Sequence, residues 1–148
     1  MKRSNFVISL VIGVAMAVSV ATASAGVISN VQVNPFTISP NGDGMSDSTV
    51  ITIDLADTVG AVHVLILEKD LMTVVDSLVK GIPRGAGTLI TSWDGTDSGG
   101  VTVAEDSFFV FVRTTGLQPA DSVTLKVKVD LTPPQVLITN VDPNDFAP

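Results

Sequence analysis

The feature that most constrains the fold is a succession of short segments with β-strand patterning, separated by turns rich in glycine, proline, asparagine and aspartate. In residues 48–55, Ile51, Ile53 and Leu55 alternate with polar residues, so one face of this segment is apolar. No segment after residue 25 has the periodicity of an amphipathic helix. The segments that we expect to form strands are 27–33, 48–55, 61–67, 71–79, 88–93, 107–114 and 121–129.

Short strands at this spacing indicate an all-β fold. About seven strands in about 100 residues are typical of an Ig-like or fibronectin III-like antiparallel β-sandwich. The chain has no cysteine, so we expect a sandwich without a disulfide. The almost continuously apolar run 61–67 indicates a central strand. We expect loops at 81–87, which holds three glycines and one proline, and at 94–100, whose sequence is DGTDSGG.

The first 25 residues have the three parts of a signal peptide. Lys2 and Arg3 precede an apolar run, and an Ala-Ser-Ala cleavage site ends at Ala25. An uncleaved membrane anchor is the alternative, but the apolar run is short for a span. We therefore expect export through the Sec pathway to the periplasm, the cell surface or the extracellular space, with no membrane contact after cleavage. Cleavage would leave 6 basic and 15 acidic residues, a net charge of −9, which disfavours nucleic acid as a partner.

The C-terminal residues differ from the preceding domain. Residues 131–134 read Leu-Thr-Pro-Pro, and neither proline can donate a hydrogen bond to a sheet. Residues 138–148 (ITNVDPNDFAP) resemble residues 28–40 (ISNVQVNPFTISP), which indicates the start of a second, truncated repeat. A merely similar disordered tail is the alternative. We expect a signal peptide at 1–25, one β-sandwich domain at 26–130, and a linker with the start of another repeat at 131–148.

Several motifs carry a family resemblance. The run SPNGDGMSD before an alternating strand, then VHVLILEKDLMTVV, then GTLITSWDGTDSGGVTV, resembles the FlgD Ig-like domain family. The most specific part is the set Trp93, Asp94, Gly95, Asp97 and Gly100. The resemblance implies an Ig-like repeat that occurs in tandem in large secreted and surface proteins of bacteria. The SPNGDG motif also resembles the C-terminal domains of type IX secretion and gliding-motility proteins.

The loop at residues 39–47 is a candidate calcium site. Asn41, Asp43 and Asp47 stand where an EF-hand-type loop places oxygen ligands, and Gly44 stands at its glycine position. The twelfth position is Val50 rather than a glutamate, so we expect at most a weak calcium site, and no other cofactor is required. The alternative is a pair of turns that asparagine and aspartate side chains stabilise, with Gly42 and Gly44 at positive φ.

The second glycine-rich motif is expected to be structural. Trp93 ends a strand and is the only tryptophan, so we expect it in the core. We expect Asp94 and Asp97 to cap the DGTD turn through its backbone, and Gly95 and Gly100 to supply turn conformations. A second cation site that includes Glu105 or Asp106 is an alternative.

The residue inventory favours a protein without catalytic activity. His63 is the only histidine, it lies in an apolar run, and the chain has neither cysteine nor tyrosine. We expect a non-catalytic spacer or interaction module at the N-terminus of a larger bacterial extracellular or surface protein. Expected partners are neighbouring Ig-like repeats, other domains of the same polypeptide, cell-surface proteins or glycans. Alternatives are an accessory domain of a secreted hydrolase, a carbohydrate-binding module and a type IX sorting module.

Overall fold

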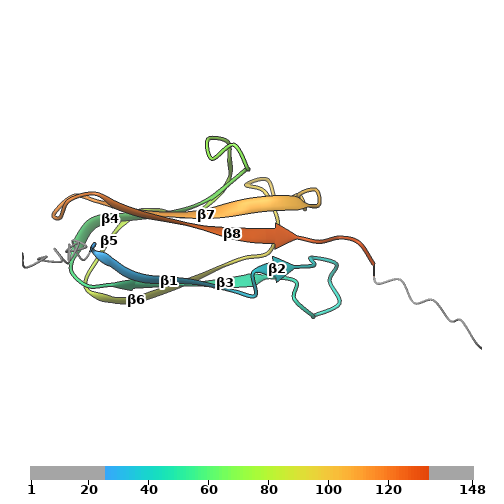
Figure 1. The fold of residues 1–148 in the computed structure, drawn as a ribbon, viewed down its shortest axis with the longest axis horizontal. Coiled ribbons are helices and arrows are strands. Elements are labelled where there is room, and N and C mark those ends of the chain that lie inside the picture. The colour runs from blue at the N-terminus through green and yellow to red at the C-terminus, as the bar shows by residue number, and fades with distance from the viewer. Residues whose placement is uncertain (1–25, 134–148) are drawn as a thin grey trace, which may run out of the picture.

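The computed structural model describes residues 26–133, which form eight β-strands (Figure 1). Within these residues, no helix is long and apolar enough to span a membrane. The strands are β1 (Ile28–Asn34), β2 (Thr37–Ile38), β3 (Thr49–Leu55), β4 (Val59–Leu67), β5 (Val74–Arg84), β6 (Gly87–Trp93), β7 (Asp106–Thr115) and β8 (Asp121–Val129).

The strands form two sheets that pack face to face, so the predicted all-β sandwich is confirmed (Figure 1). One sheet has the order β1-β3-β6, and the other has the order β2-β8-β7-β4-β5. All pairs are antiparallel except β2 with β8, which run parallel over a pair of residues. Two backbone hydrogen bonds join these strands: the Lys128 N–H donates to the Phe36 carbonyl at 2.8 Å, and the Asp130 N–H donates to the Ile38 carbonyl at 2.9 Å.

The alternation that was read from the sequence places the apolar side chains between the sheets. Ile51, Ile53 and Leu55 of β3 are buried, as are the even-numbered residues from Val62 to Ile66 of β4. Trp93 is 1% exposed and is the largest of the fully buried side chains. The buried core consists of Ile28, Ile38, Ile51, Ile53, Leu55, Val59, Val62, Val64, Ile66, Val79, Leu89, Trp93, Phe108, Val110, Val112, Val127 and Val129.

The predicted bounds around β5 were wrong. The strand was expected at 71–79, but it begins only at Val74. Residues 81–87 were expected to form a loop, but β5 continues to Arg84 and β6 begins at Gly87. β5 is the outermost strand of its sheet, so Pro83 can lie in it without breaking a ladder on both sides. Gly81 has φ of 70° and stands where the register with β4 shifts, which is the geometry of a β-bulge.

The two ends of the sandwich differ in the strands and loops that lie there (Figure 1). β1 begins at one end, where the Ile28 N–H donates to an Asp121 carboxylate oxygen at 3.0 Å. β8 ends at the opposite end, where residues 39–48, 68–73 and 94–105 also lie (Figure 1). We call this second end, with these three segments, the loop end.

Candidate functional site

The loop of residues 39–47 closes around the Asp47 carboxylate. The backbone N–H groups of Asn41, Gly42 and Gly44 donate to its two oxygens at 3.1, 2.9 and 2.7 Å. The N–H groups of Gly42 and Gly44 hold the pKa of Asp47 below its ordinary value of 3.8, with a smaller contribution from Asn41. The loop therefore has the geometry of an anion-binding site, and the Asp47 carboxylate of the same loop occupies it.

Asn41 and Asp43 make the other side-chain contacts of this loop. The Asp43 N–H donates to Asn41 Oδ1 at 2.9 Å, and Asn41 Nδ2 donates to Asp43 Oδ2 at 3.0 Å. The Met45 N–H donates to Asp43 Oδ1 at 2.7 Å. Gly42 and Gly44 have φ of 78° and 82°, a region that glycine adopts without strain.

The structure thus brings the three candidate calcium ligands into one loop, where each oxygen already accepts a hydrogen bond. Across the described residues 26–133, no group of three or more His, Cys, Asp and Glu side chains is arranged to hold a metal ion. A calcium ion would compete with the N–H groups for the same oxygens of Asp43 and Asp47. Calcium binding at Asn41, Asp43 and Asp47 stays a prediction.

Trp93 anchors the second motif from inside the core. Its indole Nε1–H donates to the Thr96 carbonyl at 2.7 Å, and its ring meets Phe108 edge to face with the centroids 5.4 Å apart. Asp94 Oδ1 accepts from the Thr96 N–H at 3.1 Å and from the Thr96 hydroxyl at 2.6 Å. These contacts attach the turn after β6 to the hydrophobic core.

Asp97 stabilises the next turn of the same motif. Its Oδ1 accepts from the N–H groups of Gly99 and Val101 at 2.9 and 3.0 Å. Gly100 has φ of 78° with open space around it, so this position needs a glycine for its backbone conformation and not for packing. The carboxylates of Asp94 and Asp97 therefore both bind the backbone of their own loop.

Gly95 lies at the contact between loops 39–47 and 94–100. A methyl group at its Cα would lie 2.8 Å from Pro40 Cγ and 3.3 Å from Ile38 Cδ1. Gly95 is buried and has φ of 77°. The loops 39–47 and 94–100 therefore pack directly on each other at the loop end, although the sequence separates them.

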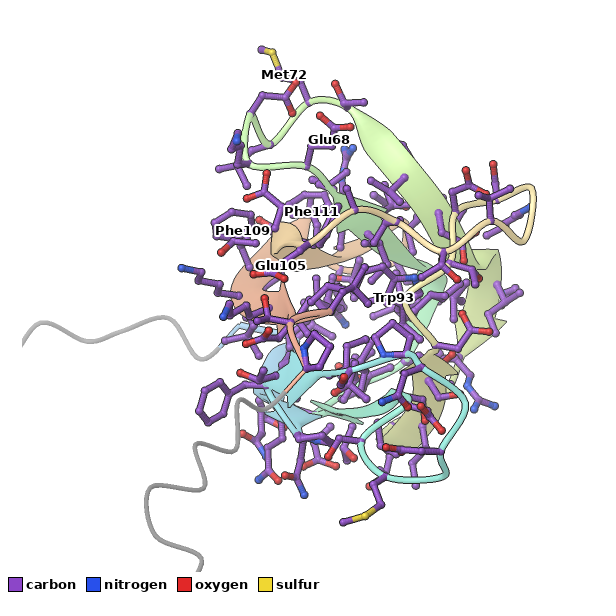
Figure 2. The ribbon with its side chains drawn as sticks, turned by 90° about the vertical axis from the view of Figure 1, so that its right-hand side faces the viewer. Glu68, Met72, Trp93, Glu105, Phe109 and Phe111 are labelled. Carbon is purple, nitrogen blue, oxygen red and sulfur yellow. The ribbon has the colours of Figure 1, made fainter. Side chains whose placement is uncertain are left out.

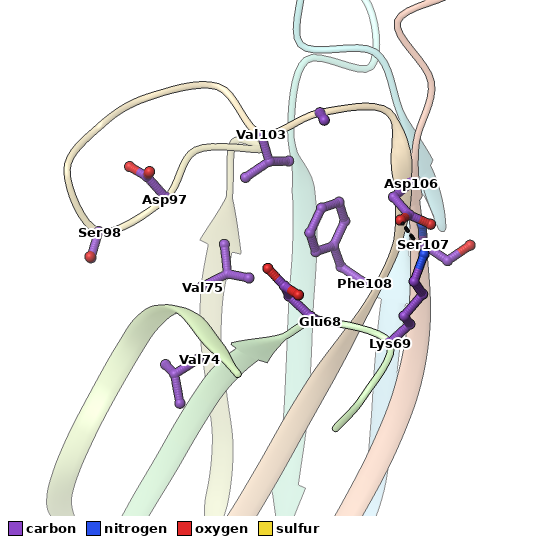
Figure 3. Close-up of a pocket in the computed structure, with 11 residues that line it drawn as sticks. Glu68, Lys69, Val74, Val75, Asp97, Ser98, Val103, Asp106, Ser107 and Phe108 are labelled. Atoms are coloured by element: carbon purple, nitrogen blue, oxygen red, sulfur yellow. Dashed lines mark hydrogen bonds and ion pairs between the residues drawn. The ribbon is translucent and has the colours of Figure 1, made fainter. Parts of the chain in front are cut away.

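Beside them lies a hollow of about 480 Å³ that sequence reasoning missed (Figure 3). Glu68 and Lys69 follow β4, Val75 belongs to β5, Val103 precedes β7, and Phe108 belongs to β7. Lys69 Nζ and Asp106 Oδ2 form an exposed ion pair of 3.0 Å at one side. The lining comes from separate hairpins, so no spacing in the sequence marks it.

The acids considered for a second cation site have other partners. Asp106 binds Lys69, and the N–H of Ser107 lowers its pKa together with that lysine. Glu105 Oε2 accepts from the Leu131 N–H at 3.2 Å and from the Thr132 hydroxyl at 2.8 Å. These contacts attach the segment after β8 to the loop end.

Comparison with known proteins assigns no family. No family model matches the chain. No curated protein matches it either. A crystal structure of FlgD from P. aeruginosa is similar, with a TM-score of 0.45 and 21% sequence identity, over 55% of this chain and 62% of that chain. The chain therefore spans less than two thirds of that protein chain. Membership of the FlgD Ig-like family stays a prediction from the motifs.

Proposed function

We propose that this chain is a non-catalytic Ig-like module that spaces and connects other parts of an exported bacterial protein. The observation that carries the proposal is that the described chain enters the sandwich at one end and leaves it at the other (Figure 1). β8 has nine residues, so one module adds about 30 Å between its neighbours at about 3.3 Å per residue.

The chemistry of the loop end supports a structural role. Asp47, Asp94 and Asp97 accept hydrogen bonds from the backbone of their own loops, so their oxygens serve to hold turns in place. The chain also lacks cysteine and tyrosine and has a single histidine, which leaves few groups for acid–base or nucleophilic chemistry.

The proposal also includes export of the protein and attachment of the module to neighbouring domains. The signal peptide at 1–25 and the repeat start within 131–148 lie outside the described residues, except for 131–133, and both rest on the sequence patterns. We propose neighbouring Ig-like repeats or other domains of the same polypeptide as the partners. Cell-surface proteins and glycans are further proposed partners of the exported module.

The spacer role can be tested by measuring the distance between the two ends. The chain has no cysteine, so Ser29→Cys and Leu131→Cys would provide unique labelling sites at opposite ends. Single-molecule energy transfer between dyes with a short Förster radius, comparable to the length of the module, should give one narrow population whose efficiency is clearly lower than that of the control. Ser29→Cys with Ala120→Cys is the matched control, since both residues lie near the end where β8 begins, and it should give high efficiency. A broad distribution for the first pair would contradict a stiff spacer.

A further inference from the structure

Asn41 and Gly42 form the dipeptide from which an asparagine amide is lost most readily. No other asparagine in the sequence precedes a glycine. Glycine has no side chain to hinder its own backbone nitrogen, and its backbone is the least restricted. Both residues are exposed in the loop of residues 39–47. In an unfolded chain, this dipeptide would therefore be the main site of spontaneous deamidation.

The reaction joins the Gly42 nitrogen to the side chain of Asn41. The nitrogen gives up its proton to solvent and attacks Asn41 Cγ, the new C–N bond closes a cyclic succinimide, and Nδ2 leaves as ammonia. Water then opens the ring at either carbonyl carbon and leaves aspartate or isoaspartate at position 41. The attack therefore needs a Gly42 nitrogen that can lose its proton and an Asn41 side chain that can turn toward it.

The fold holds the attacking nitrogen on a carboxylate. The Gly42 N–H donates to Asp47 Oδ1 at 2.9 Å. The pKa of Asp47 is held below its ordinary value by the N–H groups of Gly42 and Gly44, so this carboxylate is charged at neutral pH. Loss of the Gly42 proton would place two negative charges side by side, which is unfavourable. The nitrogen is therefore a poor nucleophile while this hydrogen bond lasts.

The Asn41 side chain is held as well. Its Oδ1 accepts from the Asp43 N–H at 2.9 Å, and its Nδ2 donates to Asp43 Oδ2 at 3.0 Å. Any rotation of the Asn41 amide breaks both contacts. Both reacting groups of the dipeptide are thus immobilised, although neither residue is buried.

The same carboxylate also holds the nitrogen of the second such dipeptide in the loop. Aspartate followed by glycine forms the same cyclic succinimide, with loss of water in place of ammonia. The Gly44 N–H, which follows Asp43, donates to Asp47 Oδ2 at 2.7 Å. One oxygen of Asp47 therefore binds each of the two nitrogens that could attack the preceding side chain.

We propose that Asn41 is a latent deamidation site and that Asp47 suppresses its reaction in the folded protein. The reaction proceeds only from molecules in which the loop has opened and Gly42 has left Asp47. Its product has a carboxylate at position 41, which would face the Asp43 carboxylate where an amide now donates a hydrogen bond. Deamidation therefore prevents the loop from closing as before and leaves a permanent record of its opening.

The rate of deamidation in the folded and unfolded protein tests the proposal. Incubation in heavy-oxygen water labels each product, because the oxygen gained at position 41 comes from water, and mass spectrometry of the peptide that contains Asn41 measures it. At the same pH and temperature, the native protein should react at least about tenfold more slowly than the protein unfolded in urea. In the absence of urea, Asp47→Ala should react at least about tenfold faster than the wild-type protein.

Asp70→Ala is the matched control. Asp70 also accepts backbone N–H groups, those of Met72 and Thr73, at 2.8 and 2.9 Å. Its turn lies on the opposite side of Trp93 from the loop of Asn41 (Figure 2). This variant should therefore deamidate at the wild-type rate, and melting temperatures show whether each variant folds.

The comparison of native and unfolded wild-type protein needs no variant, so it decides the question even if Asp47→Ala does not fold. The proposal is overturned if the native protein deamidates as fast as the unfolded protein, or faster. It is also overturned if a folded Asp47→Ala variant reacts no faster than the wild-type protein, or if Asp70→Ala accelerates the reaction as much.

Discussion

Asp47 is a single carboxylate that faces three N–H groups of its own loop. In an unfolded chain these groups would be hydrated separately, so the native contact favours the ionised form of Asp47. The folded-state pKa of Asp47 therefore lies below its ordinary value of 3.8. A depressed pKa means that this carboxylate stabilises the fold above the unfolded pKa and that the contribution disappears as pH falls through the folded pKa.

Asp47→Asn should expose this pH dependence. We expect the variant to have a lower melting temperature than the wild-type protein at pH 7, because an amide offers one acceptor oxygen where the carboxylate offers two. The difference should shrink as pH falls below 3.8, where the unfolded chain takes up the proton first, and it should vanish below the lowered pKa of folded Asp47. Melting curves from pH 7 to about pH 2 would measure it. A difference that stays constant over this range would contradict the assigned role.

Calcium should have little effect on this loop if its hydrogen bonds already satisfy Asp43 and Asp47. We expect the melting temperature to change by less than about 1 °C between chelator and millimolar calcium, the range of weak extracellular sites. Asp43→Ala is the matched variant, because it removes a candidate ligand and leaves Asp47 in place. A rise of several degrees in the wild-type protein that Asp43→Ala abolishes would instead establish the predicted calcium site.

At the scale of the elements, two glycine substitutions can distinguish the stability that comes from packing between loops 39–47 and 94–100 from the stability that comes from their backbone conformations. Gly42→Ala adds a methyl group in open space at φ of 78°, so it should cost about 1–2 kcal/mol from conformational strain alone. Gly95→Ala has nearly the same φ but directs the methyl group at the stiff Pro40 ring. It should cost about 2–5 kcal/mol, since overpacking adds to the strain. Urea unfolding of both variants measures the difference, and equal losses would show that the contact with Pro40 contributes nothing.

The strands were predictable from the sequence because their side chains alternate between core and solvent, as Ile51, Ile53 and Leu55 do in β3. Residues 81–87 misled the prediction because an edge strand tolerates Pro83. The contact between the two loops escaped it, since their approach depends on the pairing of Thr49 with Trp93 across β3 and β6. The hollow between Glu68 and Phe108 escaped it for the same reason, because separate hairpins converge there.

On the scale of the whole molecule, we expect the parallel pair of β2 and β8 to contribute to the resistance of the domain to tension. When the ends of the described chain are pulled apart, β1 draws β2 toward one end while β8 is drawn toward the other (Figure 1). Because the two strands are parallel, the bonds from Lys128 to Phe36 and from Asp130 to Ile38 lie across the pulling direction. They are loaded together in shear and do not open one after another.

Lys128→Pro should therefore lower the force at which the domain unfolds in a single-molecule pulling experiment. Proline removes the N–H that binds the Phe36 carbonyl, whereas the exposed ion pair of Lys128 with Asp130 contributes little. Lys126→Pro is the matched control, because its N–H faces the same edge of β8 but β2 pairs only with Lys128 and Val129. Equal forces for the two variants would contradict this account. In a module placed in series along an extended polypeptide, these two hydrogen bonds would thus add to the β1–β3 ladder in resisting extension.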